Sequence, residues 1–472
     1  MSLYLLISRN WKRRFFLTIW LLVCGGSSVK GQSLTYATQV GYLRFYQRLG
    51  GFVPEGESVT VGQVEVREAT GSMGYLPDLT DPEFADLSYE IMDGPSVTSG
   101  HATIVSGLLF SRHYSLSPVV KKAKFYLSDA KTGFLQSEST LNWLSPSGPA
   151  SLGVQVLNNS WITDPLDIRV STQLNRRYDW LAEAHDIVIV AGVPNNISEP
   201  LPPLVSCIYN GIVVGVSSGN CAHGPVLFQE SDGVTAGRCK PDIVAPMPVS
   251  SSATPIIASV ATVLLDDVAI RKAAGDTRFE NAQKPIVTKS IIQTGANKLA
   301  GWAKGDPADP TDDETYPLDF RQGAGQVDID HSEFILSLGK QSPGLVSWSG
   351  WTYEATIQPL DSRLYYFALN DTKGKRLSAT LNWHRKIRST GEPYTIDLAT
   401  LAHLQFEIYS FDGTNFTLLQ ASRSPVDNLQ HLYLPELDPA IYVLRVINVG
   451  DVPTDFALSW ATLPKTEQGV TP

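Results

Sequence analysis

Glu65, His101 and Ser251 are residues of the types that together can activate a hydroxyl group for attack on a carbonyl carbon. In such a set the imidazole takes the hydroxyl proton, and the carboxylate holds the imidazole and stabilises the imidazolium that forms. Ser251 comes just before an apolar run, Ile256–Leu265, that favours a buried helix. A hydroxyl at the start of a helix lies near unpaired backbone N–H groups and the positive end of the helix dipole, both of which stabilise an oxyanion.

The segment before this serine is the most distinctive stretch of the chain. Residues 240–246 read Lys-Pro-Asp-Ile-Val-Ala-Pro, and Ser-Ser-Ala-Thr-Pro follows from Ser251 onward. This pattern resembles the serine segment of the subtilases, the subtilisin-like serine peptidases, and the resemblance implies Ser251 as the nucleophile. Val249 and Ser252 replace a glycine and a methionine of the family pattern. Ser250 and Ser252 are rival nucleophiles because three serines are adjacent, and a serine-rich helix cap is the structural alternative.

Two earlier segments resemble other parts of the same family's active site. Residues 99–107 resemble His-Gly-Thr-His-Val-Ala-Gly and place His101 as the general base, whereas a capping or core histidine is the structural alternative. Residues 58–66 resemble a strand ending in Val-Ile-Asp-Thr-Gly and place Glu65 on the aspartate. That role needs only a carboxylate that accepts the imidazole N–H, although a strand-end carboxylate is often simply solvated. The other candidate acids are Glu68, Asp78 and Asp81.

A fourth segment resembles the wall of the substrate cleft. Residues 156–161 resemble the family strand Val-Ile-Asn-Met-Ser-Leu, whose end lines the cleft. The resemblance implies that Ser160 and Trp161 contact the substrate. Taken together, the matching segments follow one another in the order that subtilases use, from about residue 59 to about residue 338.

A fifth segment resembles the part of the family that holds the oxyanion. Residues 186–195 resemble the strand that leads into Ala-Ala-Gly-Asn, which places Asn195 on the asparagine that donates to the tetrahedral intermediate. Removal of one such donor typically lowers the turnover number by a factor of about 10²–10³. Pro194 replaces a glycine, Asn196 is the alternative donor, and an asparagine turn after a strand is the structural alternative.

These segments need a scaffold that brings their ends together, and the apolar patterns between residues 58 and 338 favour a parallel α/β sheet flanked by helices. Runs rich in valine and isoleucine favour strands at residues 59–66, 154–158, 187–191 and 211–216. Helices are expected between them at residues 101–110, 167–185, 253–266 and 285–294. The resemblance implies the same subtilisin-like fold over residues 32–338.

A change of pattern after residue 338 divides the chain. Residues 339–344, Gly-Lys-Gln-Ser-Pro-Gly, favour a linker. Seven short strand-like runs with turn residues between them favour an all-β sandwich domain over residues 345–465, followed by a tail over residues 466–472. The runs cover residues 364–369, 377–383, 404–411, 416–421, 431–437, 441–448 and 456–463.

The first residues have the pattern of an export signal. Lys12, Arg13 and Arg14 precede an apolar run over residues 15–24 that is too short to span a bilayer. We therefore predict a signal peptide over residues 1–31 and a secreted protein, either extracellular or periplasmic. No later segment predicts a membrane anchor. Subtilases commonly carry a folded propeptide, for which the residues before Ser58 leave no room, so folding and latency fall to another part of the chain.

The composition describes a globular protein, with 18% charged and 43% hydrophobic residues. The formal net charge of −10 argues against nucleic acid as a partner. We expect a monomer whose partner is a protein or peptide substrate.

Three cysteines follow the signal segment, namely Cys207, Cys221 and Cys239. In an oxidising compartment this number predicts one disulfide and one free thiol. The same cysteines with His223 could hold zinc, but the spacing lacks the paired Cys-x-x-Cys of most zinc sites. The peptide hydrolysis that the resemblance implies requires no cofactor. Calcium is common in the family, and the acidic loop over residues 306–314 offers oxygen ligands for it.

Three functions are compatible with these patterns. The first is a serine-type endopeptidase that forms an acyl-enzyme intermediate through a Ser-His-Glu triad. The second is an inactive subtilase-fold protein with a binding or structural role, which the replacements at Val249, Ser252 and Pro194 and the glutamate in place of the aspartate favour. The third is a surface-binding protein whose sandwich exposes tryptophans to a carbohydrate or a protein. The candidate tryptophans are Trp348, Trp351 and Trp383, for which the core is the structural alternative.

Overall fold

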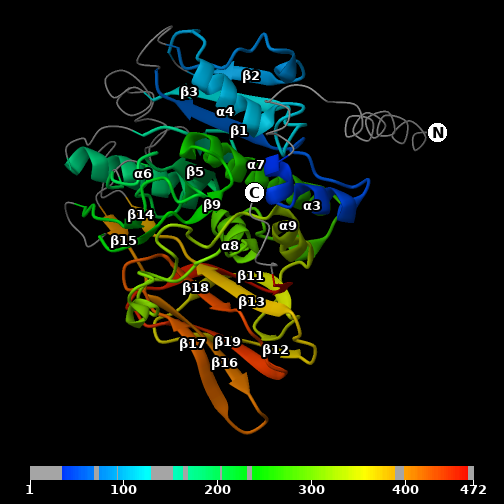
Figure 1. Cartoon of the computed structure of the whole chain (residues 1–472), viewed down its shortest axis with the longest axis vertical. Coiled ribbons are helices and arrows are strands. Elements are labelled where there is room, and N and C mark those ends of the chain that lie inside the picture. Colours follow the sequence, from blue (N-terminus) through cyan, green and yellow to red (C-terminus); the bar gives the residue numbers. More distant parts are fainter. Residues whose placement is uncertain are drawn as a thin grey trace.

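The computed structural model describes residues 35–67, 74–92, 94–128, 152–162, 168–201, 205–230, 236–388 and 398–465. The predicted signal peptide and C-terminal tail lie outside the described residues, as does the alternative acid Glu68. The larger first part of the described chain builds a parallel sheet with its helices, and the second part builds a five-stranded and a four-stranded sheet (Figure 1).

A seven-stranded sheet organises the first part, and all of its strand pairs are parallel. In spatial order the strands are β2 (Ser88–Ile91), β3 (Lys122–Leu127), β1 (Thr60–Glu65), β4 (Val156–Asn159), β5 (Val188–Gly192), β6 (Ile212–Val216) and β9 (Ile243–Ala245). The predicted α/β architecture is therefore confirmed. The sequence patterns missed β2 and β3 because these strands lie at one edge, where β2 is exposed throughout and β3 begins Lys-Ala-Lys.

Six helices of eight or more residues are described around this sheet. They are α3 (Tyr42–Leu49), α4 (Gly100–Phe110), α6 (Ile168–His185), α7 (Ser250–Ala273), α8 (Pro285–Gly295) and α9 (Ile329–Ser337). The predicted helix over residues 253–266 is longer at both ends than expected, so that Ser251 lies inside its first turn. Among the described helices only α7 is long and apolar enough to cross a membrane, but 89% of its apolar window is buried inside the protein.

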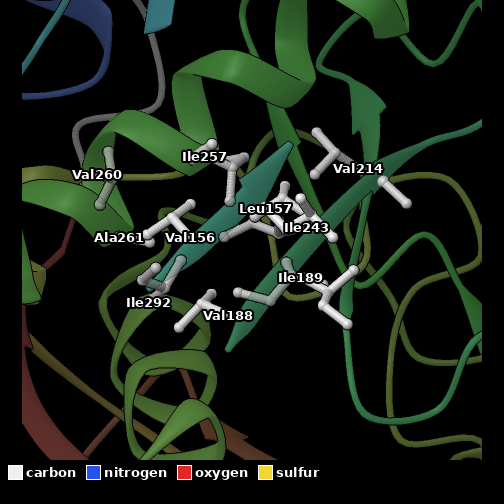
Figure 2. Close-up of a cluster of buried hydrophobic side chains, with 14 of the residues drawn as sticks. Val156, Leu157, Val188, Ile189, Val214, Ile243, Ile257, Val260, Ala261 and Ile292 are labelled. Carbon is white, nitrogen blue, oxygen red and sulfur yellow. The ribbon is translucent and has the colours of Figure 1, made fainter. Parts of the chain in front are cut away.

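The centre of the core lies where β4 and β5 meet α7 and α8. Figure 2 shows Val156 of β4 and Val188 of β5 gathered with Ala261 of α7 and Ile292 of α8. All of these side chains are buried. Strands of a parallel sheet are covered on both faces, which explains why β4, β5 and β6 are buried throughout and why β5 and β6 carry no polar side chain.

The second part is a β-sandwich, as predicted. One sheet has the order β10 (Gly344–Leu345), β12 (Ser362–Leu369), β19 (Ala440–Asn448), β16 (Leu404–Phe411) and β17 (Phe416–Ser422). The other has the order β11 (Ser349–Ile357), β20 (Thr454–Pro464), β13 (Lys375–Asn382) and β18 (Leu429–Leu434). All pairs are antiparallel except β10 with β12. Strand β11 was missed by the sequence patterns.

Several shorter elements complete the described fold. The strands are β7 (Gly224–Pro225), β8 (Cys239–Lys240), β14 (Lys386–Arg388) and β15 (Leu398–Thr400). The single-turn 3₁₀ helices are η1 (Pro82–Phe84), η2 (Thr277–Phe279) and η3 (Pro310–Asp312).

Helix α8 lies between the parallel sheet and the sandwich (Figure 1), and all eleven of its residues are buried. Its Thr294 hydroxyl is 2.7 Å from the Ser459 hydroxyl of β20, and Gln293 accepts a hydrogen bond of 2.9 Å from Asn382 of β13. The segment predicted as a linker is also held, because the backbone of Lys340 donates to Arg278. The sandwich therefore packs directly against the domain of the parallel sheet and covers α8.

The burial of the three candidate tryptophans decides between a core position and a ligand platform. Trp351 and Trp383 are fully buried, and only Trp348, which is 46% exposed, lies at the surface. The former two are therefore core residues of the sandwich and its interface, not platforms for a ligand.

The three cysteines form no disulfide, contrary to the sequence-based expectation, and all are buried free thiols. The sulfur of Cys221 accepts from the backbone of Val216, whereas that of Cys239 donates to the carbonyl of Leu318. Burial raises the pKa of the Cys207 thiol to about 11. No group of three or more histidine, cysteine or acidic side chains suited to a metal occurs in the described part of the chain.

Candidate active site

A cavity of about 300 Å³ opens at the carboxyl edge of the parallel sheet, where ligands bind in α/β proteins. Its walls come from the ends of β1, β4 and β5 and from the first turn of α7. The lining residues are Val66, His101, Ser160, Trp161, Ile162, Gly192, Val193, Asn195, Ser250 and Ser251. A second cavity of about 240 Å³, lined by His185 and Asp186 among others, lies at the opposite edge and contains none of the predicted site residues.

Glu65 and His101 are joined by a hydrogen bond. Glu65 is the last residue of β1, and its carboxylate oxygen Oε2 lies 2.9 Å from Nδ1 of His101. Glu65 is 1% exposed, whereas the side chain of His101 is 39% exposed. A buried carboxylate thus holds one ring nitrogen while the rest of the imidazole reaches the cavity.

The start of α4 fixes the position of His101. The side chain of Ser99 caps this helix by accepting from the backbone of Ala102 at 3.1 Å. The hydroxyl of Thr103 donates to the Ser99 carbonyl and accepts from the backbone of Asp78. His101 therefore stands in a capped first turn, on the helix that packs most closely against α7.

The three adjacent serines are not equivalent. Ser250 is buried, and its hydroxyl donates to the carbonyl of Val193. Ser252 is half-buried and does not line the cavity, whereas Ser251 lines it together with His101. The geometry therefore separates Ser251 from both of its rivals.

Asn195 is oriented by the first turn of α7. Its side-chain oxygen accepts from the backbone N–H of Ser250 at 2.7 Å and lies 2.9 Å from the Ser250 hydroxyl. This orientation directs the amide NH₂ away from the helix, at a residue that lines the cavity. As the second residue of α7, Ser251 has a backbone N–H with no acceptor in its own helix. Asn195 and Ser251 thus line the same cavity.

The alternative residues are used elsewhere. Asn196 closes its own turn by accepting from the backbone of Ser198 and donating to Glu199. Asp78 accepts from the backbone and hydroxyl of Thr80, and these bonds lower the pKa of its exposed carboxyl. Asp81 caps η1.

Ser160 and Trp161, predicted to contact a substrate, both line the cavity and are themselves buried. The hydroxyl of Ser160 accepts from the side chain of Asn158 at 3.0 Å. Val66, Ile162 and Val193 complete an apolar wall that the sequence analysis did not identify. Their positions just after a strand, next to predicted site residues, are the signal that could have found them.

The distinctive segment over residues 240–246 precedes the loop that leads to Ser251, and it is held in place by a buried carboxylate. Asp242 is buried, and its Oδ2 receives Lys240 at 2.7 Å and the backbone of Val213 at 2.8 Å, while Lys289 of α8 lies 3.3 Å from Oδ1. Burial raises the pKa of Asp242, but the two ammonium groups outweigh it and hold the pKa below its ordinary value. This carboxylate ties β6, β9 and α8 together beneath the loop that leads to Ser251.

The acidic loop over residues 306–314 makes its own hydrogen bonds. Asp312 accepts from the backbone of Asp306 at 3.1 Å, and Asp309 caps η3.

Comparison with known proteins finds similar structures at low sequence identity. The prenylagaramide maturation protease PagA is 18% identical over 61% of this chain and 98% of its own, with a TM-score of 0.41. Fervidolysin from Fervidobacterium pennivorans, a keratinolytic enzyme related to subtilisin, is 13% identical over 89% of this chain and 75% of its own, with a TM-score of 0.38.

The sandwich also has a similar structure among solved proteins. The pre-peptidase C-terminal domain of a collagenase from Bacillus anthracis is 13% identical over 26% of this chain and 95% of its own, with a TM-score of 0.17. No protein-family model and no curated protein matches the sequence. The function is therefore argued from the site.

Proposed function

We propose that this protein is a secreted subtilisin-like serine endopeptidase that acts through a Ser251–His101–Glu65 triad. The observation that carries the proposal is the buried Glu65 bonded at 2.9 Å to His101, which shares one cavity with Ser251. The peptidase domain would cover residues 32–338 and the sandwich domain residues 345–465.

The geometry supports a division of roles. With Nδ1 engaged by Glu65, proton exchange falls to Nε2 of His101, which takes the proton of the Ser251 hydroxyl as that oxygen attacks the peptide carbonyl. The amide of Asn195 and the backbone N–H of Ser251 donate to the oxyanion. His101 then returns the proton to the leaving amine, and water hydrolyses the acyl-enzyme by the reverse sequence.

Two of the substitutions that favour an inactive protein, at Val249 and Ser252, lie outside the cavity lining. Val249 stands before α7 as its N-cap residue and makes no side-chain cap, and it does not line the cavity. Ser252, which replaces a methionine, also lies outside the lining. Because all three triad side chains are present, we favour an active enzyme.

A fluorophosphonate probe tests the proposal, because it reacts with a serine that is activated by a base. We expect the wild-type protein to be labelled, Ser251→Ala to lose labelling completely, and His101→Ala to slow it by several orders of magnitude. Ser252→Ala is the matched control and should label at the wild-type rate. A wild-type protein that folds but is not labelled would refute the peptidase, and labelling that survives Ser251→Ala would refute the assignment of the nucleophile.

A further inference from the structure

Gln63 is a buried amide next to the acid of the proposed triad. It is 1% exposed, and it precedes Glu65 by two residues on β1. Because side chains alternate along a strand, both residues project from the same face. That face meets α4, since Gln63 contacts the carbonyl of Ala102.

The hydrogen bonds of Gln63 fix the orientation of its amide. Its oxygen accepts from the hydroxyl of Ser106 at 2.6 Å. Its NH₂ donates to Oε1 of Glu65 at 3.1 Å and to the carbonyl of Ala102 at 3.2 Å. The flipped amide would bring its oxygen against a carboxylate and a carbonyl, so the orientation is determined by its neighbours.

The two oxygens of Glu65 therefore have different partners. Oε1 receives Gln63 of the same strand, and Oε2 faces His101 on α4. A glutamate has one more rotatable bond than an aspartate, so its carboxylate needs an additional contact to be held in one direction. The bonds of Gln63 to Ser106 and Ala102 also tie β1 to the helix that carries His101.

We propose that Gln63 is a positioning residue that holds Glu65 toward His101, with Ser106 as its anchor. This inference rests on the proposed function. The network Ser106–Gln63–Glu65–His101 is buried except for the imidazole, so no water is needed to complete it. In metal sites, loss of a residue that orients a ligand typically costs about 10–100-fold in activity, and we expect an effect of the same order for a residue that orients Glu65.

Gln63→Met tests the proposal, because methionine fills similar space without hydrogen-bonding strongly. We expect kcat for a peptide substrate to fall at least ~10-fold while KM stays within about twofold, since Gln63 does not line the cavity. The downfield proton resonance of the His101 Nδ1–H should move upfield and broaden. Ser106→Ala, which removes only the anchor, should give a smaller change in the same direction.

Gln430→Met is the matched control, because Gln430 is a fully buried glutamine of the sandwich that is bonded to Ser422 and Ser424. It should lower stability but leave kcat and the His101 resonance unchanged. An active wild type whose Gln63→Met variant keeps both kcat and the resonance would overturn the inference and leave the peptidase standing. If Gln63→Met does not fold, unchanged values in Ser106→Ala overturn it. A wild type without activity would instead refute the proposed function.

Discussion

At the scale of single residues, hydrogen bonds within the protein determine which side chains of the site are available for chemistry. Ser250 lies next to Ser251 in the sequence, yet its hydroxyl is bonded to Val193 and to Asn195. These bonds remove one serine from the chemistry and at the same time orient an amide donor. The Asn195 side chain is exposed, but its oxygen accepts from the backbone N–H of Ser250, which restricts the direction of its NH₂. Such preorganisation stabilises a developing charge.

Substitution of Asn195 tests this arrangement. Asn195→Ala should lower kcat by about 10²–10³ while changing KM much less, because the donor acts mainly on the transition state. Asn196→Ala is the control and should leave kcat unchanged, since that side chain closes its own turn. Steady-state kinetics with a chromogenic peptide measures both. Equal kcat values for the two variants would remove Asn195 from the oxyanion site.

At the scale of elements, a single buried carboxylate connects the sheet to α8. Asp242 joins Lys240, Lys289 and the backbone of β6. Removal of one member of a buried charge group costs about 3–5 kcal/mol, because the remaining charges are left uncompensated. Exposed pairs contribute far less, as charge in water is screened.

The variant Asp242→Asn should therefore lower the free energy of unfolding by about 3–5 kcal/mol. Asp276→Asn, which weakens an ion pair with the exposed Arg278, should change stability only slightly. Urea denaturation followed by tryptophan fluorescence compares the two. A similar decrease in the free energy of unfolding for both variants would show that Asp242 does not hold the sheet and α8 together.

The elements differ in how far their sequences predict them. The strands β5 and β6 were predictable because they are buried on both faces and carry continuous apolar runs. Strand β11 alternates Trp351, Tyr353 and Ile357 into the core, but the serines and glycines before it favour a loop. The residues of the proposed triad were suggested by local motifs. The role of Gln63 was not, because its partner Ser106 becomes a neighbour only when β1 packs against α4.

At the scale of the whole molecule, the sandwich and the parallel sheet share an interface with buried cations. Lys298 lies 2.8 Å from Nε2 of His431 on β18, and Nδ1 of His431 lies 2.8 Å from the hydroxyl of Thr380 on β13. Burial, together with the nearby charges of Lys298, Lys304 and Arg376, lowers the pKa of His431 well below its ordinary value. The imidazole is therefore neutral in the folded protein.

This neutral histidine predicts acid sensitivity. The unfolded chain binds a proton at His431 below about pH 6.5, whereas the folded chain binds it only when the pH reaches its lower pKa. As the pH falls through this window, the free energy of unfolding therefore decreases by up to about 1.4 kcal/mol per pH unit. His431→Gln should lose less stability between pH 7 and pH 5 than the wild type. His113→Gln, at an exposed histidine, should behave as wild type. Equal pH slopes for His431→Gln and the wild type would contradict the prediction.

The burial of α8 has a consequence for the order in which the protein is made. A chain leaves the ribosome from its N-terminus, so the residues of the proposed triad are synthesised long before β20, an inner strand of the sheet that covers α8. Until that strand arrives, one side of α8 faces water, although the folded protein buries every residue of this helix. The nascent chain would therefore contain all three residues of the proposed triad before the sandwich covers α8. We expect it to become active only late in synthesis.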